Sequence, residues 1–138
     1  MVCFYDTNSN EHSFQLASTD RRYLHKVLTT HACDLVVMEA YSASGWISDL
    51  CDELGLNKLV CSTHEEAWRW RSVKRKTDRD DALKLARLAA VDQLKPTHVP
   101  NREMREYRCI IKYRKQLVGQ VNRLKNSIRA VFVGQGIP

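Results

Sequence analysis

A strand–helix–strand pattern constrains the fold of this chain more than any other feature. Residues 35–38 are apolar throughout, which is typical of a central strand covered on both faces. Ser42 or Ser44 can cap the following helix, Gly55 can end it, and residues 56–61 are predicted to form a second buried strand. Two buried strands joined by a helix predict a right-handed parallel crossover, so the chain is of the α/β class.

The residues before this pattern predict a hairpin and a helix. Residues 2–5 are apolar, residues 6–10 are dense in turn formers, and the chain therefore reverses into residues 11–16. Ser18, Thr19 and Asp20 then offer a cap to a helix whose apolar residues follow helical spacing. A hairpin followed by a parallel crossover is the plan of a ribonuclease-H-like domain.

Charge is unevenly distributed along the 138 residues. Residues 1–60 carry four basic and eight acidic side chains, a net charge of −4, and the remaining 18 basic and eight acidic side chains give residues 61–138 a net charge of +10. Such asymmetry favours a polyanion bound to the second half, and nucleic acid rather than a membrane. The cations expected to bind it are Arg69, Arg71, Lys74, Arg75, Lys76 and Arg79.

Three acids lie within four positions of this basic segment: Asp78, Asp80 and Asp81. Asp78 and Asp81 project from one face of a helix, where their carboxylates repel each other unless a cation lies between them. One interpretation is therefore a divalent metal site beside nucleic acid. The other is structural, with Asp78 as the helix N-cap and the acids placed at the positive end of the helix dipole.

Residues 76–82, Lys-Thr-Asp-Arg-Asp-Asp-Ala, resemble the K-T-D-R-x-D-A signature of the DEDD transposases of bacterial insertion sequences. Residues 35–40 resemble the family's strand that ends in Glu-Ala, and residues 114–126 resemble its long helix after the catalytic domain. The best-studied members are guided by a bridge RNA. The similarity spans nearly the whole chain.

The resemblance implies a RuvC-like domain over residues 1–95, a mixed sheet with flanking helices that lacks its first strand. It implies that Glu39, Asp78 and Asp81 are catalytic metal ligands for Mg²⁺ in a two-metal site that cleaves and exchanges DNA strands. DNA is the implied partner, and a guide RNA is left open as a second one.

The fourth acid of the DEDD pattern has no equivalent here. The family's first strand carries it in a Gly-Ile-Asp-like segment, whereas Asp6 lies in a turn and is a poor substitute. Family members also continue into a domain that supplies a nucleophilic serine. We therefore expect a fragment, truncated at both ends, with an incomplete metal site and no activity by itself.

Pro96 and Pro100 separate this domain from a long helix over residues 101–133. Its apolar residues follow alternating three- and four-residue steps, with Arg114 as the one polar interruption, and define a heptad seam of about four repeats. The helix that carries this seam would be about 45 Å long. The seam residues are Tyr107, Ile110, Leu117, Val121, Leu124, Ile128 and Val131. A seam of this length predicts a coiled coil, formed with another chain in a homo-oligomer or with a missing segment of the protein.

Two other function classes stay open. One is a non-catalytic module that binds nucleic acid and dimerises, and the other is a structural coiled-coil protein, against which the +10 half argues. Five cysteines without metal spacing predict reduced, buried thiols. No apolar run is long enough to span a bilayer, so we expect a cytoplasmic protein.

Overall fold

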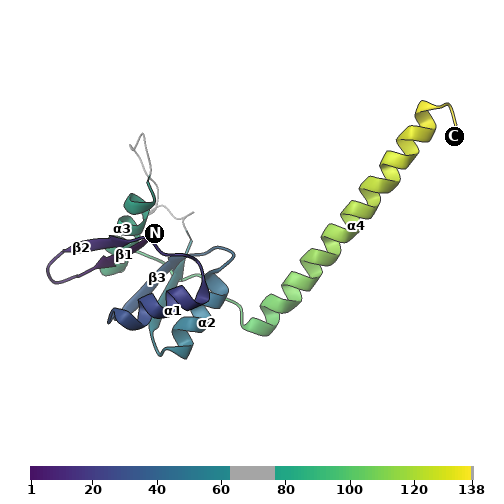
Figure 1. The fold of residues 1–138 in the computed structure, drawn as a ribbon. Helices are drawn as coiled ribbons and strands as arrows, with labels where there is room; N and C mark the ends of the chain where they lie inside the picture. Colours follow the sequence, from purple (N-terminus) through teal and green to yellow (C-terminus); the bar gives the residue numbers. More distant parts are fainter. Residues whose placement is uncertain (63–76, 138) are drawn as a thin grey trace. The chain divides into compact units, whose positions relative to one another are not determined.

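The computed structural model describes residues 1–62 and 77–137, and the chain divides into two compact units, Met1–Val99 and Pro100–Pro138. The described residues of the first unit form four strands and three helices, and those of the second form one long helix (Figure 1). The chain is thus of mixed α/β class with small sheets and a long C-terminal helix, as its pattern predicts.

Strands β1 (Val2–Tyr5) and β2 (His12–Gln15) form the predicted antiparallel hairpin. Asp6 organises the turn between them: its carboxylate accepts a hydrogen bond from the Asn8 N–H at 2.8 Å, and its carbonyl accepts one from the Asn10 N–H at 2.9 Å. Asn10 takes a positive φ of 59°, a backbone conformation that asparagine tolerates better than most residues.

Strands β3 (Leu35–Glu39) and β4 (Asn57–Cys61) are parallel and are joined by helix α2 (Ser44–Glu53). Gly55 follows the helix with a φ of +67°, so it ends α2 as predicted. The parallel crossover expected from the apolar runs is therefore present.

The expected serine cap of α2 is wrong. Ala43 is the N-cap residue and makes no side-chain cap, while Ser44 is already the first helical residue. The Ser44 hydroxyl donates to the Tyr41 carbonyl oxygen at 2.8 Å instead of accepting from the helix. It thus stabilises the turn that leads into α2.

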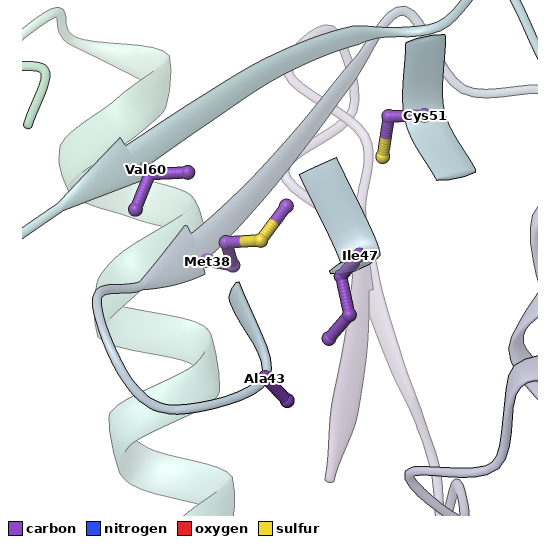
Figure 2. Close-up of a cluster of buried hydrophobic side chains, with 5 residues drawn as sticks. All are labelled: Met38, Ala43, Ile47, Cys51 and Val60. Carbon is purple, nitrogen blue, oxygen red and sulfur yellow. The ribbon is translucent and has the colours of Figure 1, made fainter. Parts of the chain in front are cut away.

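The core lies between the β3–β4 pair and the helices α1 (Arg21–Thr30) and α2. Helix α1 begins directly after the predicted cap segment, and of its three residues Asp20 is the N-cap: its carboxylate accepts from the Tyr23 N–H at 3.0 Å. Leu24 and Leu28 of α1 pack against the buried cluster drawn in Figure 2. The cluster consists of Met38, Ala43, Ile47, Cys51 and Val60.

The sheet differs from the single mixed sheet that we expected. Strands β1 and β2 form one two-stranded sheet, and β3 and β4 form another. In residues 1–62 and 77–137, no strand bonds to both pairs. Strand β3 is consequently less covered than a central strand, since Met38 is its one buried residue and Leu35 is 43% exposed.

The outer edge of β4 is covered by the chain after helix α3 (Asp78–Ala90). The Thr97 N–H donates to the Val60 carbonyl oxygen at 2.6 Å, and Pro96 forms a bridge with Cys61. The edge of this pair that remains open within the described chain is therefore that of β3.

The second unit is helix α4 (Arg102–Gly134), which agrees with the predicted helix to within one residue at each end. The Asn101 side chain caps it by accepting from the Met104 N–H at 2.9 Å. No described residue of α4 is buried, and seam residues such as Ile110 and Val131 are 65% and 66% exposed. In the described part of the chain, no helix has the length and apolar character to cross a membrane.

All five cysteines carry free thiols, as predicted. Cys51 and Cys61 are buried in the first unit, and Cys3 and Cys33 are half-buried. The prediction of a buried thiol is wrong for Cys109, which is exposed on α4 within the second unit.

Candidate active site

Asp78, Asp80 and Asp81 all lie in the first turn of α3, but they have different structural roles. Thr77 is the N-cap residue, and Asp80 completes a capping box with it. The structural interpretation that made Asp78 the N-cap is therefore wrong. Asp78 is the first helical residue, and the carboxylate held by the backbone at this helix start is that of Asp80.

Asp78 and Asp81 lie one turn apart on α3. Asp78 is exposed, whereas Asp81 is half-buried and its Oδ1 oxygen is inaccessible to solvent. Both residues line a cleft in the first unit, together with Ala82, Leu85 and Ala86 of the same helix. The spacing of these residues shows that one face of α3 forms a wall of the cleft.

Glu39 is the last residue of β3, at its carboxyl end, as predicted. Side chains alternate along a strand, so Val36 and Met38, which pack in or against the core, leave Val37 and Glu39 on the other face. Glu39 is exposed and lines the same cleft as Asp78 and Asp81. The tertiary structure thus brings the three predicted acids to one concave surface from two elements.

This cleft has a volume of about 1140 Å³ and lies between the two sheets. All of β1 and all of β3 line it, and α3 contacts both strands. The end of α1 contributes His31, whose ring lies 4.1 Å from that of Phe4 on β1. The cleft therefore separates the hairpin from the parallel pair along the full length of both strands.

The oxygen ligands offered by the three acids suit a hard divalent cation such as Mg²⁺. The described residues nevertheless contain no group of three or more histidine, cysteine, aspartate or glutamate side chains placed to hold a metal ion. The donor chemistry of the predicted site fits Mg²⁺, and its side chains line a common cleft without being drawn together around one point.

Asp6 also lines the cleft, but its carboxylate is engaged in the hairpin turn. The Asn8 N–H and the Ser9 hydroxyl both donate to it, at 2.8 and 3.1 Å. These hydrogen bonds, with that of Asn8 dominant, lower the pKa of Asp6 below its usual value. The interpretation of Asp6 as a turn residue therefore agrees with its contacts.

Arg79 is the one predicted nucleic-acid-binding cation among the described residues. Its guanidinium carbon lies 5.7 Å from the centroid of the Phe14 ring, within the range of a cation–π contact. This contact joins α3 to β2. The other five, Arg69, Arg71, Lys74, Arg75 and Lys76, lie outside the described residues.

A transposase family model, that of the DEDD transposases of IS110 type, matches residues 2–135 of the chain. The chain belongs to the DEDD transposase family. The match covers nearly the whole chain, including the Lys76–Ala82 segment, β3 and α4. No curated protein and no solved structure gives a significant match.

Membership of the DEDD transposases places this chain in a family that acts on DNA in transposition and is typically metal-dependent. The match extends over the segments that carry the predicted acids. These acids line the cleft from β3 and α3.

The sequence did not point to several residues that line the cleft of this DEDD transposase. His12 and His31 lie on its walls, as does Tyr41, whose pKa is raised by burial. These residues come from three separate segments and carry no motif. Only the packing of the hairpin and the end of α1 beside β3 could have revealed them.

Proposed function

We propose that this chain forms a nuclease half-site of a DNA transposase, in which Glu39, Asp78 and Asp81 hold Mg²⁺ at a DNA phosphodiester. The observation that carries the proposal is that all three acids line one cleft although two different elements supply them. When bound, Mg²⁺ would activate a nucleophile and stabilise the leaving oxygen. The side chains of this chain would hold the cation and position the backbone of the DNA strand.

We further propose a ribonuclease-H-like fold in which the cleft is the place of a central strand. Strands β1 and β3 face it with edges that, in the described chain, pair on one side only. A strand inserted there would bond to both and would join the two small sheets into the mixed sheet of that fold. An acid at its carboxyl end would lie beside Glu39 and complete the set of four.

The chain by itself should accordingly not cleave DNA. Three carboxylates that are not drawn together bind a divalent cation weakly, because Mg²⁺ demands near-octahedral geometry. The inserted strand would bring the fourth acid and would order the edges of β1 and β3. In this proposal DNA is the substrate, in the cytoplasm, and a guide RNA is a further candidate partner.

Helix α4 is proposed to pair with α4 of a second copy. The seam residues share one side of the helix and are 43–66% exposed. No described residue of the second unit packs over them closely enough to bury them. Knobs-into-holes packing of two such seams would bury them. The expected species is a homodimer held by a coiled coil.

A second candidate function is a module that binds nucleic acid and dimerises without catalysis. It is favoured by the absence of a grouped metal site among the described residues and by the excess of cations in residues 61–138. In that case, nucleic-acid binding would be sensitive to salt and unaffected by Asp78→Ala and Asp81→Ala.

The test measures Mn²⁺ binding calorimetrically, with and without a synthetic apolar peptide that ends in aspartate. We expect tighter Mn²⁺ binding with this peptide than with a control peptide that ends in asparagine. Glu39→Gln, Asp78→Asn and Asp81→Asn should each abolish that difference. Mn²⁺ binding that is unchanged by all three substitutions would refute the site, and Mg²⁺-dependent nicking of plasmid DNA by the chain alone would refute its inactivity.

A further inference from the structure

Helix α4 carries a row of cations on the side opposite its apolar seam. The row consists of Arg108, Lys112, Lys115 and Arg123, all exposed. At 3.6 residues per turn they fall within about 80° of one another, and the middle of the row lies about 180° around the helix from the middle of the seam. The row extends for about 22 Å along the helix axis.

No acid neutralises this row within the helix. Residues 107–134 contain seven basic and no acidic side chains. Ion pairs among the described residues include those of Arg21 with Glu53, Lys58 with Asp52 and Arg102 with Glu106. The row contributes to none of these three pairs, and Arg123 Nε makes a long hydrogen bond to the Gly119 carbonyl oxygen at 3.4 Å.

We propose that this row on α4 is a docking surface for the phosphate backbone of duplex DNA. A duplex carries one negative charge per about 1.7 Å with both strands counted, so a segment as long as the row contains about 13 phosphates, of which part face the helix. A straight row of cations can lie along the axis of a duplex, and binding releases the counterions condensed on the phosphates. The inference rests on the proposed function in that DNA is the polymer bound, but it concerns a surface remote in sequence from the acids.

The geometry favours DNA over a lipid surface. A helix that lies in a bilayer interface buries its apolar side, which here would turn Arg108, Lys112 and Lys115 directly away from the headgroups. A helix that pairs through its seam turns the same row outward, where a duplex can lie along it. Neutralisation by DNA would also offset the repulsion between two such basic helices.

The experiment measures binding of the full chain to a 30-base-pair duplex by fluorescence anisotropy, over a range of salt concentrations. The row variant combines Arg108→Gln, Lys112→Gln and Lys115→Gln, since glutamine keeps helix propensity while removing charge. Loss of three phosphate contacts should lower the slope of log K against log salt by about 2.7. Affinity at about 0.1 M salt should fall by tenfold or more.

The matched control combines Arg114→Gln, Lys125→Gln and Arg129→Gln, which removes the same charge from other sides of α4. It should keep the slope of the original chain to within about 1. Circular dichroism of both variants checks that the helix is retained. Equal losses of DNA affinity and of salt slope in the two variants would refute the row as the docking surface, because they would show that only net charge matters.

Two further arms separate this inference from other outcomes. The same pair of variants is tested with phosphatidylserine vesicles and with an RNA hairpin. Binding to the vesicles that depends on the row, or binding to RNA but not to duplex DNA, would refute the proposal of a DNA docking surface. The row variant should retain the peptide-dependent Mn²⁺ binding of the original chain. A chain that binds Mn²⁺ but shows no row-dependent DNA binding would refute this inference alone, and a chain that binds no DNA at all would refute the proposed function as well.

Discussion

Thr77 and Asp80 form reciprocal hydrogen bonds across the first turn of α3. The Asp80 N–H donates to Thr77 Oγ1 at 3.3 Å, and Asp80 Oδ2 accepts from the Thr77 N–H at 3.3 Å and from the Thr77 hydroxyl at 2.6 Å. Asp80, the middle acid of the motif, therefore belongs to the cap of α3. Asp78 and Asp81 are the two that line the cleft.

Replacing the cap residue should destabilise the first unit. Thr77→Ala removes the acceptor for the Asp80 N–H and should lower the free energy of unfolding by about 1 kcal/mol. Thr77→Ser retains a hydroxyl and serves as the control, with a smaller loss. Urea unfolding followed by circular dichroism measures both, and equal stability of Thr77→Ala and the original chain would contradict the capping role.

The acids of the motif should separate into structural and metal-binding groups. At a Mg²⁺ concentration of about ten times Kd, binding to the folded state adds about 1.4 kcal/mol to the free energy of unfolding. Asp78→Asn should abolish that gain. Asp80→Asn should lower stability without Mg²⁺ and keep the gain, because its carboxylate belongs to the capping box. Thermal unfolding with and without Mg²⁺ tests this, and loss of the gain in both variants would refute the division.

Arg79 and Phe14 should be energetically coupled. Their contact at 5.7 Å joins α3 to the hairpin, and exposed cation–π pairs contribute about 0.5–1 kcal/mol. A double-mutant cycle with Arg79→Met and Phe14→Leu should give a coupling energy of that size. Additive effects of the two substitutions would indicate that the contact contributes nothing to stability and that Arg79 is available for DNA.

The thiols should differ in reactivity. Cys109 is exposed on α4, whereas Cys51 is fully buried and burial raises its pKa. Thiolate is the reactive form, so a disulfide reagent near neutral pH should label Cys109 first and Cys51 only after unfolding. Mass spectrometry of the labelled peptides gives the order, and Cys109→Ser should remove the fast phase. A fast phase that persists in this variant would contradict the exposure of the helix.

Stability at low pH should depend on Asp6. Hydrogen bonds from Asn8 and Ser9 lower its pKa in the folded state, so its contribution is present above the unfolded value of about 3.9 and is lost as pH falls through the folded value. Urea unfolding from neutral pH to about pH 3 should show a shallower pH dependence for Asp6→Asn. Glu11→Gln removes a charge from the same hairpin as a control, and identical curves for both variants would contradict the role of the turn.

Local patterns predicted much of the fold because each depends on neighbours in sequence. The apolar runs gave β3 and β4, Asp20 and Gly55 marked the ends of helices, and the spacing of apolar residues predicted α4. The cap of α2 was missed, because whether a serine lies before or within the first turn depends on the path of the chain from β3. The exposure of Cys109 was missed for a similar reason, since it depends on what covers α4.

The sequence by itself determined the family, the residue types of the candidate site and the two-sided character of α4, since these depend on spacing along the chain. Only the tertiary structure decided that Glu39 shares a cleft with Asp78 and Asp81 and that the hairpin stands apart from the parallel pair. Strand pairing and clefts arise from contacts between residues distant in sequence. The periodicity of one segment carries no record of which other segment lies beside it.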